Sequence, residues 1–367
     1  MSGFLARFFC VAAAVMCFGC QSIGPGVIEK SHPKYNDALT SAIDQQLLAN
    51  IVKLKYRENP MFLEVSSVTE NWRLAFDAGL DRSEILAADR GTTRPSWYGP
   101  KAMLGESQSP TISYHPVRGK EFIKHMMTPV PLSVTLGMSS SGWKLQRVFN
   151  LCIEKINDVQ NAPTASGPMP WNKPEYEKFY EMTELLKKLE DENVVVVGIA
   201  PDDDQHLVMR VKESASKNPD VARFKRILGL DSNKNEFRFE SNFLKSSGDG
   251  LVVRTRSLMG ILFYLSHAVE VPPEDIERGV VQTTFNSDGT VFDWSRNASG
   301  TLLKVHCSKT KPKNAFVATN HRGHWFYIDD SDLHSKSTFM FVSMLFSLQA
   351  GEASGADVAP MLTIPVR

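Results

Sequence analysis

The chain has 367 residues, of which 42% are hydrophobic and 22% are charged, and this composition excludes an intrinsically disordered protein. Its 41 lysine and arginine residues balance 41 aspartate and glutamate residues, so no basic surplus indicates a nucleic-acid partner. The length is enough for one large domain or for two of ordinary size.

The first twenty residues are typical of an export signal. Arg7 supplies a positive charge, an uncharged apolar stretch covers 8–18, and Gly19 precedes Cys20. The stretch is shorter than the roughly 20 apolar residues of a membrane-spanning helix. A small residue before cysteine, followed by a polar segment, resembles the lipobox of bacterial lipoproteins, whose cysteine receives a diacylglycerol. Because Cys17 stands where that lipobox usually has leucine, a secretory signal cut after Gly19 and a plain N-terminal anchor are alternatives.

We therefore predict a signal peptide at 1–19 and a lipid anchor at Cys20, followed by a tether that extends to residue 34. Acyl chains would hold the protein at a membrane, because each buried CH₂ group contributes about 0.8 kcal/mol. Gln21, which is not aspartate, favours the outer membrane under the enterobacterial sorting habit. The expected location is the bacterial cell envelope, facing the periplasm, with the membrane and other envelope proteins as partners.

Beyond the tether the pattern alternates between helical and strand periods. Apolar residues recur at helical spacing from Leu39 to Leu54, and Pro60 ends that helix. Trp72, Leu74 and Phe76 then alternate with polar residues, which predicts a strand. The polar, turn-rich segment 78–110 predicts a long surface loop.

The domain prediction depends on residues 161–175, which contain four prolines and no periodic pattern. We interpret them as a linker between an N-terminal region, 35–160, and a C-terminal region, 176–367. Strand patterns come in adjacent pairs, for example NVVVVGIAP and HLVMRVKES, with helical patterns between the pairs. This order predicts an α+β fold of mostly antiparallel sheets of paired strands with packed amphipathic helices.

The densest polar cluster lies within NHRGHWFYIDDSDLHSKS. Its imidazoles and carboxylates are the side chains that metals and polar ligands bind, so they are the candidate site: His321, His324, Asp329, Asp330 and His334. The spacing matches no zinc motif. The alternative is structural, with a hairpin turn at Arg322–Gly323 and a strand-to-helix loop at 329–332, followed by a helix that Ser335 caps.

Cysteines and aspartates supply weaker candidates. Cys152 and Cys307 could form a disulfide in an oxidising compartment, or they are two separate buried thiols. Asp202–Asp204 could bind calcium but lacks the alternation of an EF-hand loop, so a solvated turn is the alternative. Trp97 and Tyr98, with other tryptophans, could form a sugar platform or serve as structural aromatics.

Residues 253–267 contain three further candidates. Ser257 could be a nucleophile, but no G-x-S-x-G motif surrounds it, and a helix cap is the better interpretation. Arg254 and Arg256 could bind an anion or be exposed strand residues. The apolar helix that holds His267 predicts a buried core histidine rather than a ligand. The residues identify no cofactor.

Three stretches, DQQLLANIVKLKYRENPMFLEVSSV, VVRTRSLMGILFYLSHAVEVP and HWFYIDDSDLHSKSTFMFVSMLFSLQ, resemble a group of uncharacterised bacterial envelope proteins, often lipoproteins. The resemblance covers 36–350 in patches and implies no activity. We predict a membrane-tethered envelope lipoprotein that acts as a binding or scaffold component. The alternatives are a periplasmic hydrolase with its site near 321–334, and a protein that binds glycan or a small ligand through 78–110.

Overall fold

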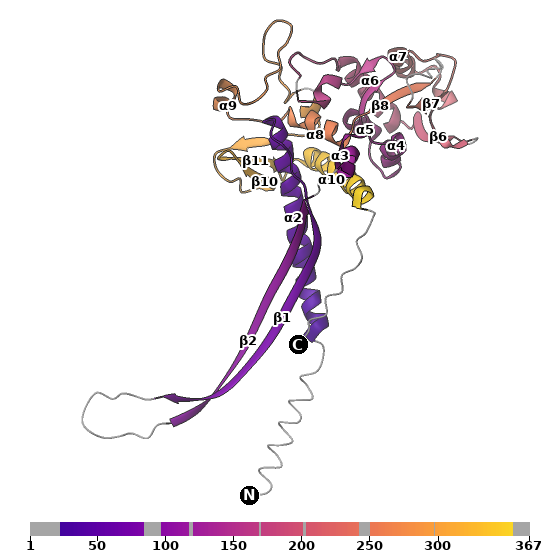
Figure 1. Cartoon of the computed structure of the whole chain (residues 1–367). Helices are drawn as coiled ribbons and strands as arrows, with labels where there is room; N and C mark the ends of the chain where they lie inside the picture. The colour runs from indigo at the N-terminus through magenta and orange to yellow at the C-terminus, as the bar shows by residue number, and fades with distance from the viewer. Residues whose placement is uncertain are drawn as a thin grey trace. The chain divides into compact units, whose positions relative to one another are not determined.

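We describe the protein from a computed structural model over residues 23–83, 97–116, 120–168, 170–200, 203–241, 250–296 and 298–354. The fold is α+β with largely antiparallel sheets, which confirms the predicted fold class (Figure 1). The chain divides into two compact units, one of residues 61–118 and one that combines 1–60 with 119–367. The predicted signal peptide and Cys20 lie outside the described residues.

The unit of residues 61–118 is an antiparallel pair of two long strands, β1 (Leu63–Ser83) and β2 (Trp97–Pro116). Their register runs from Leu63 opposite Pro116 to Ser83 opposite Trp97. The surface loop predicted at 78–110 is therefore wrong for 78–83 and 97–110, which are strand residues. Glycine and proline weaken a strand locally, but pairing along the whole register supplies backbone partners and overrides that preference.

The second unit contains a six-stranded sheet in the order β4-β3-β8-β7-β6-β5. Neighbouring strands are antiparallel except for β7 and β8, which are parallel. The predicted strand pair around the three aspartates is confirmed as β5 and β6. The strand bounds are β3 Ile153–Ile156, β4 Val159–Gln160, β5 Val195–Ala200, β6 Asp203–Val211, β7 Glu236–Glu240 and β8 Leu251–Thr255.

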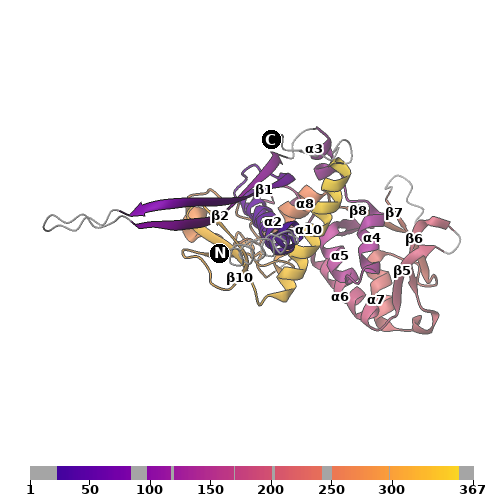
Figure 2. The same ribbon diagram turned by 90° about the horizontal axis from the view of Figure 1, so that it is seen from below.

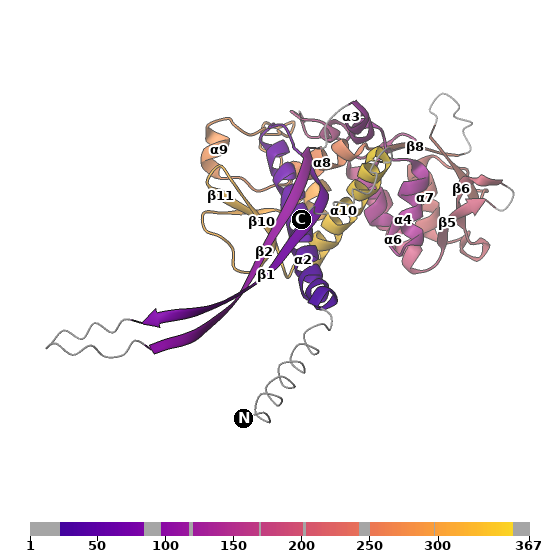
Figure 3. The same ribbon diagram turned by 60° about the horizontal axis from the view of Figure 1, so that its bottom comes forward.

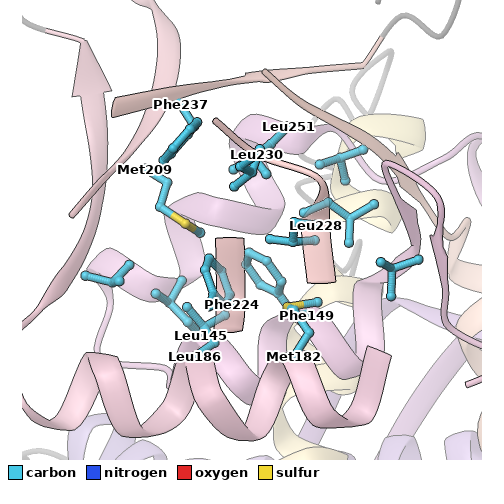
Figure 4. Close-up of a cluster of buried hydrophobic side chains, with 14 of the residues drawn as sticks. Leu145, Phe149, Met182, Leu186, Met209, Phe224, Leu228, Leu230, Phe237 and Leu251 are labelled. Carbon is cyan, nitrogen blue, oxygen red and sulfur yellow. The ribbon is translucent and has the colours of Figure 1, made fainter. Parts of the chain in front are cut away.

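Helices gather beside this sheet and bury its core (Figures 2 and 4). In α6, Phe179, Met182, Leu186 and Leu189 recur every three or four residues, so one face of the helix is buried. Asn218 caps α7 by accepting a hydrogen bond from Asp220 N. The bounds are α3 Lys120–Met127, α4 Leu132–Ser140, α5 Leu145–Cys152, α6 Glu177–Asp191, η2 Glu213–Ala215 and α7 Pro219–Leu228.

The remaining elements of this unit surround the buried helix α8, and α2 contacts both α8 and β10 (Figure 3). A small antiparallel sheet has the order β10-β11-β9. The bounds are α2 Ile23–Lys55, η1 Pro163–Ser166, α8 Leu258–Ser266, α9 Pro273–Glu277, η4 Ala298–Thr301, β9 His306–Ser308, β10 Ala315–His321, β11 His324–Asp329 and α10 Leu333–Ser354.

Two predicted connecting segments are ordered structure. Helix α2 begins at Ile23, so 23–34 of the expected tether is helical. Segment 161–175, expected to separate two domains, lies inside one compact unit. Asn161, Ala162 and Ala165 are buried in that unit, because the proline-rich segment packs against the core as the short helix η1. Its composition predicted the absence of long regular elements but not this packing.

Candidate functional site

The cluster predicted at 321–334 is split between the two ends of one β-hairpin. Strands β10 and β11 pair so that His321 lies opposite His324 beside the turn Arg322–Gly323, which confirms the predicted hairpin turn. Asp329 ends β11, one strand length away from that turn. A strand rises about 3.3 Å per residue, so its two ends cannot share one small site. Within the described ranges, no group of three or more His, Cys, Asp or Glu side chains could hold a metal ion.

Charged partners from α9 and from the segment just after α2 surround the turn. Arg322 Nε and Nη2 both donate to Glu58 Oε1, at 3.0 and 2.8 Å. His321 Nε2 lies 3.3 Å from Glu58 Oε2, and His324 Nε2 lies 3.6 Å from Glu274 Oε1. Neither His321 Nε2 nor His324 Nδ1 makes a hydrogen bond with the described residues. Burial lowers the pKa of His321, so its ring is neutral at pH 7.

Tyr56, at the C-terminal end of α2, connects this turn to the interior. Its hydroxyl donates to Asp275 Oδ2 at 2.8 Å, and both side chains are buried. The Tyr56 ring lies 5.2 Å from the His321 ring, and the Arg322 guanidinium lies 4.7 Å from the ring centroid. Burial raises the pKa of Tyr56, so the hydroxyl keeps its proton. These contacts hold the end of α2 against the hairpin and α9.

The acidic residues at the other end of the hairpin stabilise the loop after β11 and the N-terminus of α10. Asp329 Oδ1 accepts a hydrogen bond from Ser331 N at 2.8 Å. Asp330 pairs with Lys336 at 2.7 Å. Asp332 accepts a bond from Ser335 N at 3.0 Å, so Asp332 rather than Ser335 caps α10, which corrects the predicted cap.

His334, the last member of the predicted cluster, contacts α5 instead of the other members. Its Nδ1 lies 3.1 Å from Arg147 Nη2, and its backbone carbonyl accepts from Arg147 Nη1 at 2.9 Å. Burial is the largest cause that lowers the pKa of His334, and the Arg147 charge adds to it. The five predicted residues therefore make separate structural contacts at three places: the hairpin turn, the loop before α10, and the contact of His334 with α5.

The two cysteines are not joined. Cys152 is buried at the end of α5, Cys307 is half-buried on β9, and both thiols are free. Burial raises the pKa of Cys152 to about 12 and that of Cys307 to about 11, so both thiols are protonated at neutral pH. The disulfide that the sequence allowed is not formed, because Cys152 ends α5 whereas Cys307 lies on β9 of the small sheet. Of the predicted calcium candidates, Asp203 begins β6 and Asp202 lies outside the described residues.

Arg256 is a buried structural residue, which contradicts its interpretation as an exposed strand arginine or an anion ligand. Its Nη1 donates to the backbone oxygens of Asn150, Leu151 and Ile153 at 3.1–3.2 Å, and Nη2 donates to Asn161 O. The guanidinium also lies 3.9 Å from the centroid of the Tyr264 ring. Its hydrogen bonds therefore fasten the 161–166 segment to the end of α5. A buried cation needs such partners.

The other candidates of this region are structural as well. Ser257 Oγ accepts a hydrogen bond from Gly260 N at 3.1 Å, so the predicted helix cap is confirmed. His267 is buried, stacks on Trp294 at 4.9 Å and places Nε2 3.1 Å from Ala165 O, which confirms the predicted core histidine. Arg254 is exposed and lies 3.3 Å from Glu154.

An apolar groove that the sequence analysis missed lies along α10. It has a volume of about 810 Å³ and is lined by α2, β10 and α10. Phe316 and Phe339 contribute aromatic surface, with ring centroids 6.0 Å apart. Four apolar side chains of α10 along this groove stay exposed: Leu333 by 70%, Met340 by 52%, Met344 by 41% and Leu348 by 49%. Such contiguous exposed apolar surface marks an interaction site more often than isolated exposed residues do.

A polar cavity of about 720 Å³ adjoins the groove and shares Thr40, Asp44 and Phe316 with it. Asp44 lies half-buried on α2, and burial raises the pKa of its carboxyl group. Within the described residues, the Asp44 carboxylate makes no hydrogen bond or ion pair. The groove therefore contains an apolar face and, beside it, the Asp44 carboxylate, which has no ion-pair partner within the described residues.

One sequence signal could have indicated this site. The α10 stretch carries apolar residues on several faces, and the face opposite the groove buries Phe341, Val342 and Leu345. A helix with apolar residues on several faces is normally covered on those faces. The signal does not say which side is open, because that depends on α2 and β10, which are distant in sequence.

No protein-family model matches the chain, and comparisons with curated proteins and with solved structures found no match. The resemblance to envelope proteins therefore stays a prediction. In the part of the chain that the structure describes, no helix combines the length and the apolar character needed to cross a membrane.

Proposed function

We propose that this protein is a non-catalytic binding or scaffold component of the bacterial envelope, tethered to a membrane through a lipid at Cys20. The exposed apolar face of α10 carries the proposal. It lies in a groove where it can pack against a partner, and it is continuous over four turns from Leu333 to Leu348. The predicted anchor would keep that face in the envelope.

Burial of the exposed side chains of the groove would supply part of the binding free energy, about 4 kcal/mol for four side chains, and other contacts of the partner would supply the rest. Fully burying a leucine or methionine side chain contributes about 1.5–3 kcal/mol. The four side chains are roughly half exposed, so each retains about 1 kcal/mol for a partner to recover. Methionine is also adaptable and common on surfaces that accept a partner helix. The hydrolase alternative has no comparable support, because its residues are separated and paired internally.

The test is native mass spectrometry of the full chain released gently from membranes. We expect a lipidated species that carries a second protein, and we expect Met344→Asp to lose that protein while the lipid mass at Cys20 remains. Ile199→Asp is the matched control, because Ile199 on β5 is 62% exposed and lies outside the groove. Retention of the partner by Met344→Asp, or its loss from both variants, would contradict the proposal.

A further inference from the structure

The groove presents a pattern that a helix can match. Its α10 wall places Leu333, Met340, Met344 and Leu348 at positions i, i+7, i+11 and i+15, which lie on one helical face. This stripe is about 22 Å long at 1.5 Å per residue. Ser337, Ser343 and Ser347 also line the groove, and their small side chains leave room for ridges from an opposing helix.

Asp44 adds a charge requirement to this apolar face. It lines both the groove and the adjoining polar cavity. The nearby Lys336 is already paired with Asp330 at 2.7 Å, and Lys311 lies 5.3 Å from the centroid of the Trp325 ring. Burial raises the pKa of Asp44 because the carboxylate has lost hydration without gaining a counter-charge. A cation from a partner would supply that charge.

We infer that the groove binds an amphipathic helix of a partner protein, whose apolar face packs on α10 and whose lysine or arginine pairs with Asp44. This inference rests on the proposed function and names the chemistry of the partner. The length and the regular spacing of the stripe favour a helix over a single acyl chain. The polar cavity offers the basic side chain water and hydrogen-bond acceptors from Asn36 and Gln45. Lys311 and Lys313 line the β10 side of this cavity, but within the described residues neither forms an ion pair with Asp44.

The test uses the full-length protein in nanodiscs, with empty nanodiscs as the blank, and fluorescent 16-residue peptides. The first peptide has leucine at i, i+3, i+4, i+7 and i+11 and one lysine beside the stripe. Two others replace that lysine by glutamine or glutamate. We expect the lysine peptide to bind about tenfold more tightly than the glutamine peptide, and Asp44→Asn to abolish this preference. The control Asp158→Asn, which changes an exposed carboxylate outside both the groove and the polar cavity, should retain it.

Reversing the charge at position 44 tests whether a loss of binding is caused by unfolding. Asp44→Lys should prefer the glutamate peptide, which an unfolded variant could not do. If the three peptides bind the wild-type protein equally and Met344→Asp removes all binding, the groove function stands and the Asp44 inference is wrong. If no peptide binds but phosphatidylglycerol vesicles recruit the wild-type protein through Met344, the groove faces a membrane, and both the helix inference and the partner protein are wrong.

Discussion

Helix α2 meets the β10–β11 hairpin in two places that have opposite chemistry. Just beyond its C-terminal end, Tyr56 and Glu58 meet the turn, where Tyr56 donates to Asp275 and Glu58 pairs with Arg322. Near its middle, Thr40 and Asp44 lie beside Phe316 in the groove, where apolar surface is exposed and the carboxylate has no internal partner. The two places share the same elements, so the difference is not one of fold.

The turn and the groove differ in which of their residues are available to a partner. The turn contains the dense histidine and acid pattern that first attracts notice, yet its charges serve internal contacts. The groove has no comparable density of histidine and acid, but it leaves apolar area exposed and the Asp44 charge unpaired. Contiguous exposed apolar surface indicates a missing partner more reliably than a high density of polar residues does. The turn also has unpaired polar atoms, since His321 Nε2 and His324 Nδ1 make no hydrogen bond within the described residues. The predictions below change one place at a time and ask whether stability or binding responds.

The largest loss of stability should come from lowering the pH, because His267 is buried in a form that does not accept a proton. Lys55 donates to His267 O at 2.7 Å, and burial lowers the pKa of His267 to about 3. Below the unfolded pKa of about 6.5, the unfolded chain binds a proton that the folded chain refuses, so stability falls as pH falls. We expect a loss of about 2–3 kcal/mol in unfolding free energy between pH 6.5 and pH 4.5.

Urea denaturation at a series of pH values measures this loss. The variant His267→Gln should show a flatter profile over the same interval, although it starts from a lower stability at pH 7. A wild-type profile that is flat from pH 6.5 to 4.5 would mean that His267 accepts its proton as readily in the folded protein as in the unfolded chain.

The next effect should come from the hydroxyl at the turn. Tyr56→Phe removes the donor to Asp275 Oδ2 and leaves a buried carboxylate oxygen without that partner. We expect a loss of about 1–3 kcal/mol in unfolding free energy, measured by urea denaturation. Tyr35→Phe is the matched control, because Tyr35 lies on the same helix but is only half-buried. Equal stability of the two variants would show that the Tyr56 contact is not structural.

The smallest stability effect should come from the groove. Met344→Asp places a charge at a half-exposed helix position and loses the buried part of the methionine side chain, so we expect a loss of about 1 kcal/mol in unfolding free energy. The same variant should lose its partner, which separates binding from stability. A loss of several kcal/mol would mean that the groove is already covered by this chain, and it would remove the distinction between the two places.

Local patterns predicted the elements well and their assembly poorly. The β5–β6 pair and the buried face of α6 follow from alternation and helical spacing over short ranges. The continuation of β2 through a turn-rich segment depends on pairing with distant residues of β1, which local composition does not report. The groove depends in the same way on Asp44, Phe316 and α10, which only the folded chain brings together.

Site-specific photo-crosslinking in living cells tests directly whether the α10 groove binds a helix of a partner protein. The photoreactive residue p-benzoylphenylalanine would replace Met340 in the groove or Ile276 on α9. These two positions are 52% and 47% exposed. We predict an adduct from position 340 and none from position 276. Mass spectrometry should map that adduct to an apolar helical segment that contains a lysine or arginine. Equal adducts at both positions, or none at position 340, would contradict it.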